Sequence, residues 1–114
     1  MTIKIKRAYE EPREDDGIRI LIDRLWPRGV KKDYIKIKDW MKNIAPSWDL
    51  IKWFSHKSDN WEEFKKRYKK QLKEKEELVD KLKKISKKKT LTLVYSSSDE
   101  EHNNAIVLKE VLES

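Results

Sequence analysis

The sequence has no cysteine, only two histidines, only two glycines and no long apolar stretch. Without cysteine, a disulfide, a thiolate metal site and a cysteine nucleophile are all excluded. No 18-residue apolar window is present, and the first six residues alternate in polarity instead of forming the apolar core of a signal peptide. We therefore expect a soluble, cytoplasmic protein that has no membrane partner.

The two histidines give little reason to expect a metal site. His56 and His102 lie far apart in the chain and form neither an HxH nor an HExxH motif. We therefore predict no metal ligands. Nothing in the sequence indicates which cofactor, if any, the protein uses, or its oligomeric state.

Large aromatic residues indicate that this highly charged chain folds. Charged residues make up 43% of the 114 residues, a composition that can accompany disorder, but five Trp, four Tyr and two Phe can supply buried area. A chain of this length can bury about two thirds of the surface of its unfolded state around one core. We predict a single domain over residues 1–114.

The net charge of +7 is confined to one segment. Residues 60–89 hold 13 Lys or Arg and 6 Asp or Glu, whereas the rest of the chain has 15 of each sign. Such a segment can contact the phosphates of a nucleic acid. Its aromatic residues, however, recur on one helical stripe and do not alternate with the lysines, as expected for a solvated helix face. The sequence leaves both interpretations open.

Hydrophobic periodicity predicts three strands, a short extended piece and four helices. Alternating or β-branched apolar patterns predict strands over residues 3–8, 18–24 and 90–95, and an extended piece within 34–40. Apolar stripes at spacings of three and four predict helices over residues 47–54, 60–72, 77–88 and 99–113. One helix over 60–88 is the alternative to two, but a rod of about 40 Å is long for so small a domain.

The order of these elements is typical of α/β proteins, in which strands and helices intermix. Because helices separate the last two strands, we predict a small, mainly parallel sheet flanked by helices in a compact layered domain. Ser47 is expected to cap the helix that follows it. Ser98 and Glu101 form a capping box that is expected to begin the last helix.

Polar and aromatic side chains gather at the ends of two predicted strands. The end of the second strand and the turn after it contain Asp23, Arg24, Trp26 and Arg28. The segment after the last strand contains Ser96, Ser97, Asp99, His102 and Asn103. Ligands of open α/β sheets bind outside the carboxyl ends of the strands. If the two strands are parallel, we expect these two loops to converge on one site.

The first loop has a functional and a structural interpretation. Arg24 and Arg28 can each bind a carboxylate or phosphate through two parallel hydrogen bonds. Alternatively, Arg24 pairs internally with Asp23 or Asp99 and locks the loop. Trp26 can stack on a planar ligand or lie in the core.

The second loop has the same two interpretations. Ser96 and Ser97 can donate hydrogen bonds to an anion at the start of the last helix, or they can merely cap it. Asp99 precedes His102 by three residues, so it can orient the imidazole for proton transfer or form a local hydrogen bond with it. The acidic residues 99–101 would repel an anion at that helix.

The most distinctive motif is DRLWPRG, residues 23–29, which follows an apolar run. Further characteristic residues are Trp40, Ala45, Pro46, Ser47, Leu50, Trp53, Phe54, His56, Trp61, Phe64, Tyr68, residues 92–96, Asp99, His102, Asn103, Ala105 and Leu108. Through these residues nearly the whole chain resembles the domain-of-unknown-function family 488, in its YeaO-like subgroup. The resemblance implies a compact single-domain α/β fold and adds weight to one shared site. Longer relatives carry cysteines near the last strand and helix, so their thiol chemistry does not extend to this chain.

These observations favour a site for an anionic small molecule at the carboxyl edge of the sheet, with catalysis there left open. In a catalytic version, the acting residues are Asp23, Asp99 and His102. The ligand-binding residues are Arg24, Trp26, Arg28, Ser96, Ser97 and Asn103. The alternative hypothesis is nucleic-acid binding through the basic helices of residues 60–89.

Overall fold

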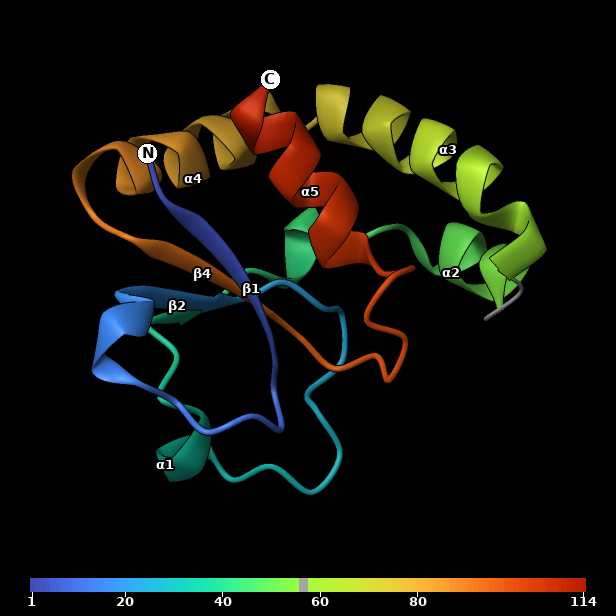
Figure 1. Ribbon diagram of the computed structural model, residues 1–114. Coiled ribbons are helices and arrows are strands. Elements are labelled where there is room, and N and C mark those ends of the chain that lie inside the picture. The colour runs from blue at the N-terminus through green and yellow to red at the C-terminus, as the bar shows by residue number, and fades with distance from the viewer. Residues whose placement is uncertain (56–57) are drawn as a thin grey trace.

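The computed structural model describes residues 1–55 and 58–114, and it contains one four-stranded sheet (Figure 1). The strands are β1 (Ile3–Arg7), β2 (Ile18–Leu21), β3 (Asp39–Trp40) and β4 (Leu91–Tyr95). They lie in the order β1-β4-β2-β3, and each neighbouring pair is parallel. The predicted α/β class with a small parallel sheet is confirmed.

Five α-helices of the described residues pack around the sheet. They are α1 (Lys32–Ile35), α2 (Trp48–Phe54), α3 (Trp61–Lys73), α4 (Glu76–Lys88) and α5 (Asn104–Glu113). Short 3-10 turns cover Glu14–Asp16, Lys42–Ile44 and Ser58–Asn60. The helices α3 and α4 are separate, as preferred, because the N–H groups of Glu74 and Lys75 close a tight turn onto Gln71 and Leu72. Ser47 caps α2 as predicted, since its Oγ accepts the N–H of Leu50 at 3.2 Å.

The predicted start of the last helix is wrong by five residues. Asp99 folds the chain into a loop, because its Oδ1 accepts the N–H groups of Glu101 and His102 at 3.0 Å each. Asn103 is extended, with φ −143° and ψ 165°, and its side chain accepts the N–H of Ile106. The cap of α5 is therefore Asn103, and Ser98 forms no capping box with Glu101.

Two other predicted boundaries also shift. The second strand ends at Leu21, three residues before the predicted end, and the chain turns towards the site from there. The extended piece predicted within residues 34–40 shrinks to the two residues of β3. Residues before it form α1, and Lys36, the residue after that helix, is in the left-handed region with φ 48°.

The sheet separates a large core from a smaller one. On one face, apolar residues of alternate strand positions, such as Ile20 and Leu93, pack against α3, α4 and α5. On the other face, Leu21 and Val94 pack with Ala8 and Ile35 of the segment around α1. Figure 1 shows α3, α4 and α5 along one side of the sheet and α1 on the opposite side. β4 is buried along its whole length, which is typical of a central strand in a parallel sheet covered on both faces.

A buried ion pair lies on the smaller face of the sheet. Arg19 of β2 and Asp16 are 4% and 1% exposed, and the Nη1 of Arg19 donates to the carboxylate of Asp16 at 2.7 Å. Lys6 of β1 contacts the same carboxylate at 3.2 Å. The hydroxyl of Thr92 donates to the carbonyl of Asp16 at 2.6 Å. Asp16 therefore joins β1, β2 and β4 through polar contacts.

Two glycines with positive φ provide a matched stability test. A Cβ added to Gly17 (φ 66°) would clash with the carbonyl oxygen of Thr90, which accepts the N–H of Ile18. A Cβ at Gly29 (φ 78°) would meet nothing within 4 Å. We expect Gly29→Ala to cost about 1 kcal/mol from backbone strain. Gly17→Ala should cost about 2–3 kcal/mol, because it also displaces the start of β2. Urea unfolding measures both, and equal losses would contradict the prediction.

Candidate functional site

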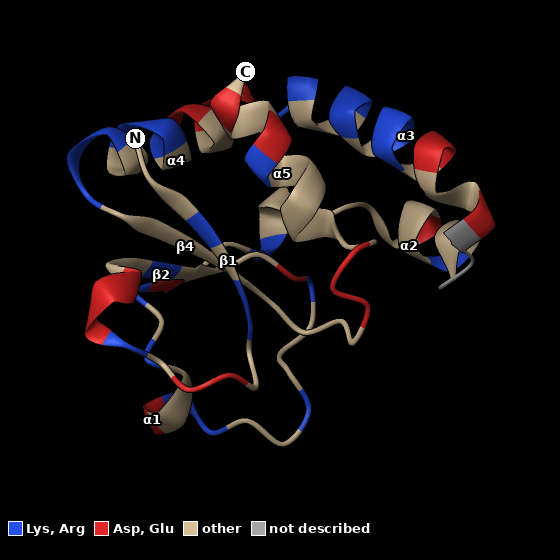
Figure 2. Cartoon of the chain, in the orientation of Figure 1, with Lys and Arg blue, Asp and Glu red and all other residues tan. Residues whose placement is uncertain are grey.

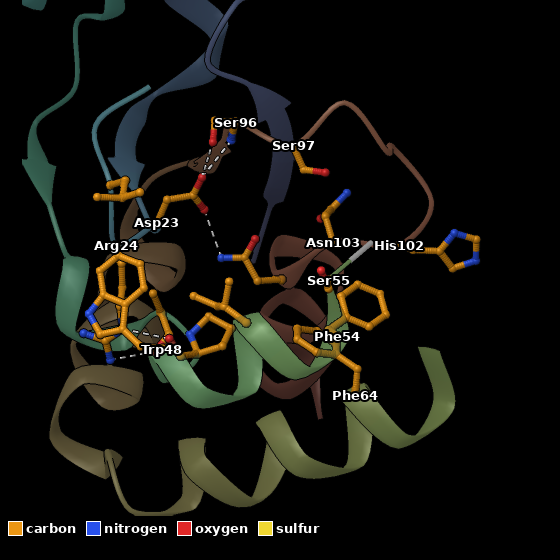
Figure 3. A pocket seen from close by; sticks show the side chains of 15 residues that line it. Asp23, Arg24, Trp48, Phe54, Ser55, Phe64, Ser96, Ser97, His102 and Asn103 are labelled. Atoms are coloured by element: carbon orange, nitrogen blue, oxygen red, sulfur yellow. Dashed lines mark hydrogen bonds between the residues drawn. The ribbon is translucent and has the colours of Figure 1, made fainter. Parts of the chain in front are cut away.

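A cavity of about 310 Å³ lies at the carboxyl edge of the sheet, among the loops that follow β2, β3 and β4 (Figure 3). Helices α2 and α3 contribute an apolar wall. The apolar lining residues are Leu25, Ala45, Pro46, Trp48, Ile51, Phe54 and Phe64. The polar ones are Asp23, Arg24, Ser55, Ser96, Ser97, His102, Asn103 and Asn104. The predicted convergence of the two loops at this edge is therefore found, and we call this cavity the edge pocket.

Asp23 ties the loop after β2 to the last strand and helix. Its Oδ2 accepts the backbone N–H of Ser96 at 2.9 Å and the hydroxyl of Ser96 at 2.7 Å. Its Oδ1 accepts the side-chain N–H of Asn104 at 3.0 Å, and Figure 3 shows these bonds. Asp23 thus holds the pocket together, and both carboxylate oxygens already have partners.

Arg24 locks its loop, but through different partners from those predicted. Its Nε donates to the carbonyl of Pro46 at 2.8 Å, and its Nη2 to the carbonyl of Ala45 at 3.4 Å. It pairs with neither Asp23 nor Asp99 in the described part of the chain. Arg24 therefore locks the loop as its structural interpretation predicted, but the predicted acidic partners are wrong, because its acceptors are backbone carbonyls after β3.

Lys75 adds a second cation behind the same wall. Its Nζ donates to the carbonyl of Ala45 at 3.1 Å, the oxygen that Arg24 also approaches. Burial, and then the positive charge of Arg24, lower the pKa of Lys75 below its usual range. Within residues 1–55 and 58–114, no carboxylate lies within 4.0 Å of either cation. Arg24 lines the edge pocket, and Lys75 places a second positive charge behind the same wall.

Trp26 and Arg28 do not line the edge pocket. The indole N–H of Trp26 donates to the carbonyl of Val30 at 2.7 Å, and its ring meets Trp40 edge-on at 5.5 Å. Trp26 therefore packs in the smaller core, as its structural interpretation predicted. Arg28 is exposed, and its backbone carbonyl accepts the hydroxyl of Tyr9 at 3.0 Å.

Asp99 and His102 form the predicted contact without sharing a helix. The Nδ1 of His102 lies 3.1 Å from the Oδ2 of Asp99, and its ring meets Trp61 edge-on at 5.1 Å. Burial raises the pKa of Asp99, but hydrogen bonds from the N–H groups of Glu101 and His102 and from the imidazole together outweigh it, so this pKa is lowered. His102 lines the pocket and Asp99 does not. In Figure 3 the imidazole points away from Asp23 and Arg24.

The remaining predicted ligand-binding residues also have structural partners. Ser96 is bound to Asp23, and the Oγ of Ser97 accepts the N–H of Asp99 at 3.1 Å. The carbonyl of Ser97 accepts the Nε of Arg7 at 2.8 Å. Asn103 caps α5 through its Oδ1 and donates to the carbonyl of Asp99. Ser96, Ser97 and Asn103 all line the pocket, so the structure brings them together with Asp23, Arg24 and His102.

The sequence reasoning missed the apolar wall of the pocket. Trp48 and Ile51 of α2 and Leu25 line it, although they are 47%, 37% and 64% exposed. A signal was present, because Trp48 and Ile51 are three residues apart and lie on a different side of the helix from Leu50 and Trp53. An apolar residue on both sides of a short helix indicates two faces with partners. The contacts of Asn104 and Lys75 at the pocket were also not predicted, because no motif or spacing around these residues indicates them.

Metal and membrane sites receive no support from the described residues. No group of three or more His, Asp or Glu side chains within residues 1–55 and 58–114 could hold a metal ion. His56 lies outside the residues that the structure describes. In the same part of the chain, every helix is too short or too polar to cross a membrane.

The basic segment forms the outer faces of α3 and α4, as the blue ribbons of Figure 2 show. On α3, Lys65 and Lys69 contact Glu110 of α5 at 3.4 and 3.2 Å. Arg67 pairs with Glu63 at 2.9 Å, and its guanidinium lies 4.1 Å from the ring centre of Trp53. Half of the six cations of α3 are therefore used within the protein, which favours the interpretation as a solvated face.

Nucleic-acid binding by these helices stays a prediction with a direct test. If it occurs, the affinity for a short DNA duplex must fall steeply between 50 and 200 mM salt, by about a factor of 10³ for six phosphate contacts. Replacing Lys66 and Lys70 by Ala should reduce the salt dependence, whereas replacing Lys31 and Lys32 should not. Fluorescence anisotropy with labelled DNA measures both. The absence of binding at 50 mM salt ends the hypothesis.

Comparison with known proteins decides the family. The family model for DUF488-N3i, described as the inactive DUF488-N3 subclade, matches residues 2–114. The chain belongs to the DUF488 family. DUF488 is the family that the motif of residues 23–29 indicated.

The relatives extend over nearly the same length. The chain is 40% identical to uncharacterized protein YeaO of Escherichia coli K12 over 114 residues, which cover all of this chain and 99% of YeaO. It is 34% identical to uncharacterized protein Rv3073c of Mycobacterium tuberculosis H37Rv over 110 residues, 96% of this chain and 92% of that relative. No solved structure matches the chain significantly. The site must therefore be interpreted from its own geometry.

Proposed function

We propose that this DUF488 protein binds a small anionic molecule in the edge pocket. The observation that carries the proposal is the pair of cations, Arg24 and Lys75, that share the carbonyl of Ala45. A carbonyl is only a partial negative charge, and among the described residues no carboxylate lies within 4.0 Å of either cation, although the charge of Glu74 partly offsets that of Lys75. Burial, and after it the charge of Arg24, lowers the pKa of Lys75, and an anion beside Arg24 would relieve the repulsion between the two cations.

Several pocket groups keep hydrogen-bonding capacity for such a ligand. Among the described residues, the Nη1 of Arg24 and the hydroxyl hydrogen of Ser97 have no acceptor. The Oδ1 of Asn104 has no donor, because its bonds run through Nδ2 to Ile22 and Asp23. The pocket volume lies at the lower end of the range of small-molecule sites, so the ligand is small.

The proposed role is binding without chemical conversion. The pair of Asp99 and His102 lies at the pocket margin, and the imidazole is turned away from Arg24 (Figure 3). Both carboxylate oxygens of Asp23 are already bound to Ser96 and Asn104, which suits a structural tie. The description of the matching subclade as inactive agrees with this role. Turnover of a bound ligand that disappears in His102→Ala would replace this proposal by an enzymatic one.

Isothermal titration calorimetry with a set of small carboxylates and phosphates tests the proposal. We expect at least one compound to bind, and Arg24→Gln to weaken its binding at least tenfold. Arg28→Ala is the matched control, because Arg28 is an exposed arginine of the same motif outside the pocket, and it should change affinity less than twofold.

Arg24→Gln also removes bonds that fix the loop, so Lys75→Met provides a second variant that keeps them. It should weaken anion binding at least threefold while circular dichroism shows an intact fold. Failure of every anion to bind, or equal losses in the Arg24 and Arg28 variants, would overturn the proposal.

A further inference from the structure

Half of the exposed large apolar side chains among the described residues line the edge pocket. The exposed large apolar residues of the described chain are Met1, Tyr9, Leu25, Tyr34, Trp48 and Ile51. Three of them, Leu25, Trp48 and Ile51, line the pocket. An apolar group of this kind rimmed by polar residues is typical of a ligand site. The ligand therefore has an apolar body as well as its charge.

The inner wall of the pocket is the end of an aromatic series. Phe54 and Phe64 line the pocket with their ring centres 4.5 Å apart and their planes inclined by 30°. Behind them, Trp61 stacks on Phe64 at 5.7 Å and 18°. Trp48 supplies another indole at the mouth. A planar ring in the cavity would meet aromatic surfaces at both ends, and such contacts contribute about 0.5–1.5 kcal/mol each beyond area burial.

The charges around the pocket favour a ligand with a single negative charge over a dianion. Arg24 and Lys75 favour an anion at one side. Asp23 lies inside the pocket, and Figure 2 shows the acidic residues 99–101 on the loop between β4 and α5. These carboxylates would repel a dianionic phosphate more strongly than a carboxylate. The free Oδ1 of Asn104 requires a donor on the ligand.

From these features we infer that the ligand is a small aromatic monocarboxylate with a hydroxyl or N–H donor on its ring. The inference rests on the proposed function and specifies it. The carboxylate faces Arg24, the ring packs among Trp48, Phe54 and Phe64, and the ring donor faces the Oδ1 of Asn104. The donor satisfies an acceptor that would otherwise be enclosed without a partner when the ligand excludes water.

Calorimetry with three matched probes tests this ligand class. The probes are 4-hydroxybenzoate, its saturated analogue 4-hydroxycyclohexanecarboxylate, and phenyl phosphate. We expect 4-hydroxybenzoate to bind at least tenfold more tightly than either of the others. Benzoate, which lacks the donor, should bind about threefold to tenfold more weakly than 4-hydroxybenzoate.

Two exposed aromatic residues provide matched variants. Trp48→Ala should weaken 4-hydroxybenzoate binding about tenfold, because the indole forms the mouth of the pocket. Tyr34→Ala, at a similarly exposed aromatic residue on α1, should leave the affinity unchanged. Both substitutions are at exposed side chains, so both proteins should fold.

The outcomes separate the two levels of the proposal. If the saturated acid or phenyl phosphate binds as tightly as 4-hydroxybenzoate, and Arg24→Gln abolishes that binding, the aromatic monocarboxylate is wrong while anion binding stands. If Trp48→Ala and Tyr34→Ala have equal effects, the ring does not lie where we place it. If none of the probes and no other anion binds, both the inference and the proposed function fail.

Discussion

Asp16→Asn should lower the free energy of unfolding by about 3–5 kcal/mol, the largest loss that we expect from a single substitution in this protein. The substitution leaves the guanidinium of Arg19 buried without its counter-charge, and breaking one side of a buried pair costs this much. One nitrogen of Arg19, Nη2, already has no hydrogen-bond partner among the described residues. Urea unfolding followed by circular dichroism measures the loss.

A double variant tests whether the stability loss of Asp16→Asn comes from the unpaired charge of Arg19 or from altered packing. In Asp16→Asn with Arg19→Met, the stranded cation is gone, and a buried apolar side chain of similar length replaces it. We expect the double variant to recover at least half of the loss, because apolar replacements of buried pairs are often near neutral. If it is less stable than Asp16→Asn alone, the pair contributes through its hydrogen bonds and not through charge balance.

The same carboxylate gives a pH prediction. Burial raises the pKa of Asp16, but bonds from the N–H of Arg13 and from Lys6 and Arg19 outweigh this effect and lower it. Because the folded pKa lies below the unfolded value of about 3.9, ionised Asp16 stabilises the protein above about pH 4. This contribution is lost as the pH falls through the folded pKa. The midpoint of urea unfolding should therefore fall below pH 4, and less steeply in Asp16→Asn. Parallel curves would contradict the assignment.

Asp23→Ala should cost about 3 kcal/mol and should also abolish ligand binding in the edge pocket. The carboxylate accepts three hydrogen bonds from Ser96 and Asn104, and bonds to a charged group contribute about 1.5–3 kcal/mol each, although not additively. Without this carboxylate, the N–H and hydroxyl groups of Ser96 and the side-chain N–H of Asn104 lose their acceptor. Thermal unfolding measures the first effect, and calorimetry with the best anion measures the second.

A surface carboxylate provides the control for Asp23. Asp15 contacts Lys4 at 3.4 Å, but its side chain is 73% exposed, so Asp15→Ala should change stability by less than about 0.5 kcal/mol. If Asp23→Ala is as mild as Asp15→Ala, the three bonds do not hold the loops. If Asp23→Ala unfolds the chain outright, Asp23→Asn, which keeps an acceptor, should retain part of the stability.

The pair of Asp99 and His102 shows how a correct contact can follow from a wrong local structure. Their spacing of three suggested neighbours on one helical face. In the structure Asp99 accepts the N–H groups of the next residues and closes a loop, which brings the imidazole back to the carboxylate. Asp99 and Asn103 both favour helix caps, and only the packing of α5 against β1 and β4 decides which one begins the helix.

The residues of the DRLWPRG motif point to different parts of the structure, and here too the tertiary packing decides where each one lies. Asp23 and Arg24 line the pocket, whereas Trp26 packs in the smaller core and Arg28 points to solvent. Each of these side chains is able either to line a pocket or to serve as a structural contact, and no neighbouring residue in the sequence indicates which. The direction in which each side chain points is set by its hydrogen-bond acceptors. Arg24 donates to the carbonyls of Ala45 and Pro46, and Trp26 donates to the carbonyl of Val30.

The sequence by itself determined the class of fold and the edge of the sheet at which the two loops converge. Strand and helix periodicities are local, and parallel strands bring the loops that follow them to one edge of a sheet. The tertiary structure decided which side chains face the pocket and which serve as ties. Ser96 and Asp23 are 73 residues apart in the sequence, and the acceptors of Arg24 lie at least 21 residues from it. The orientation of these side chains therefore depends on contacts that exist only in the folded chain.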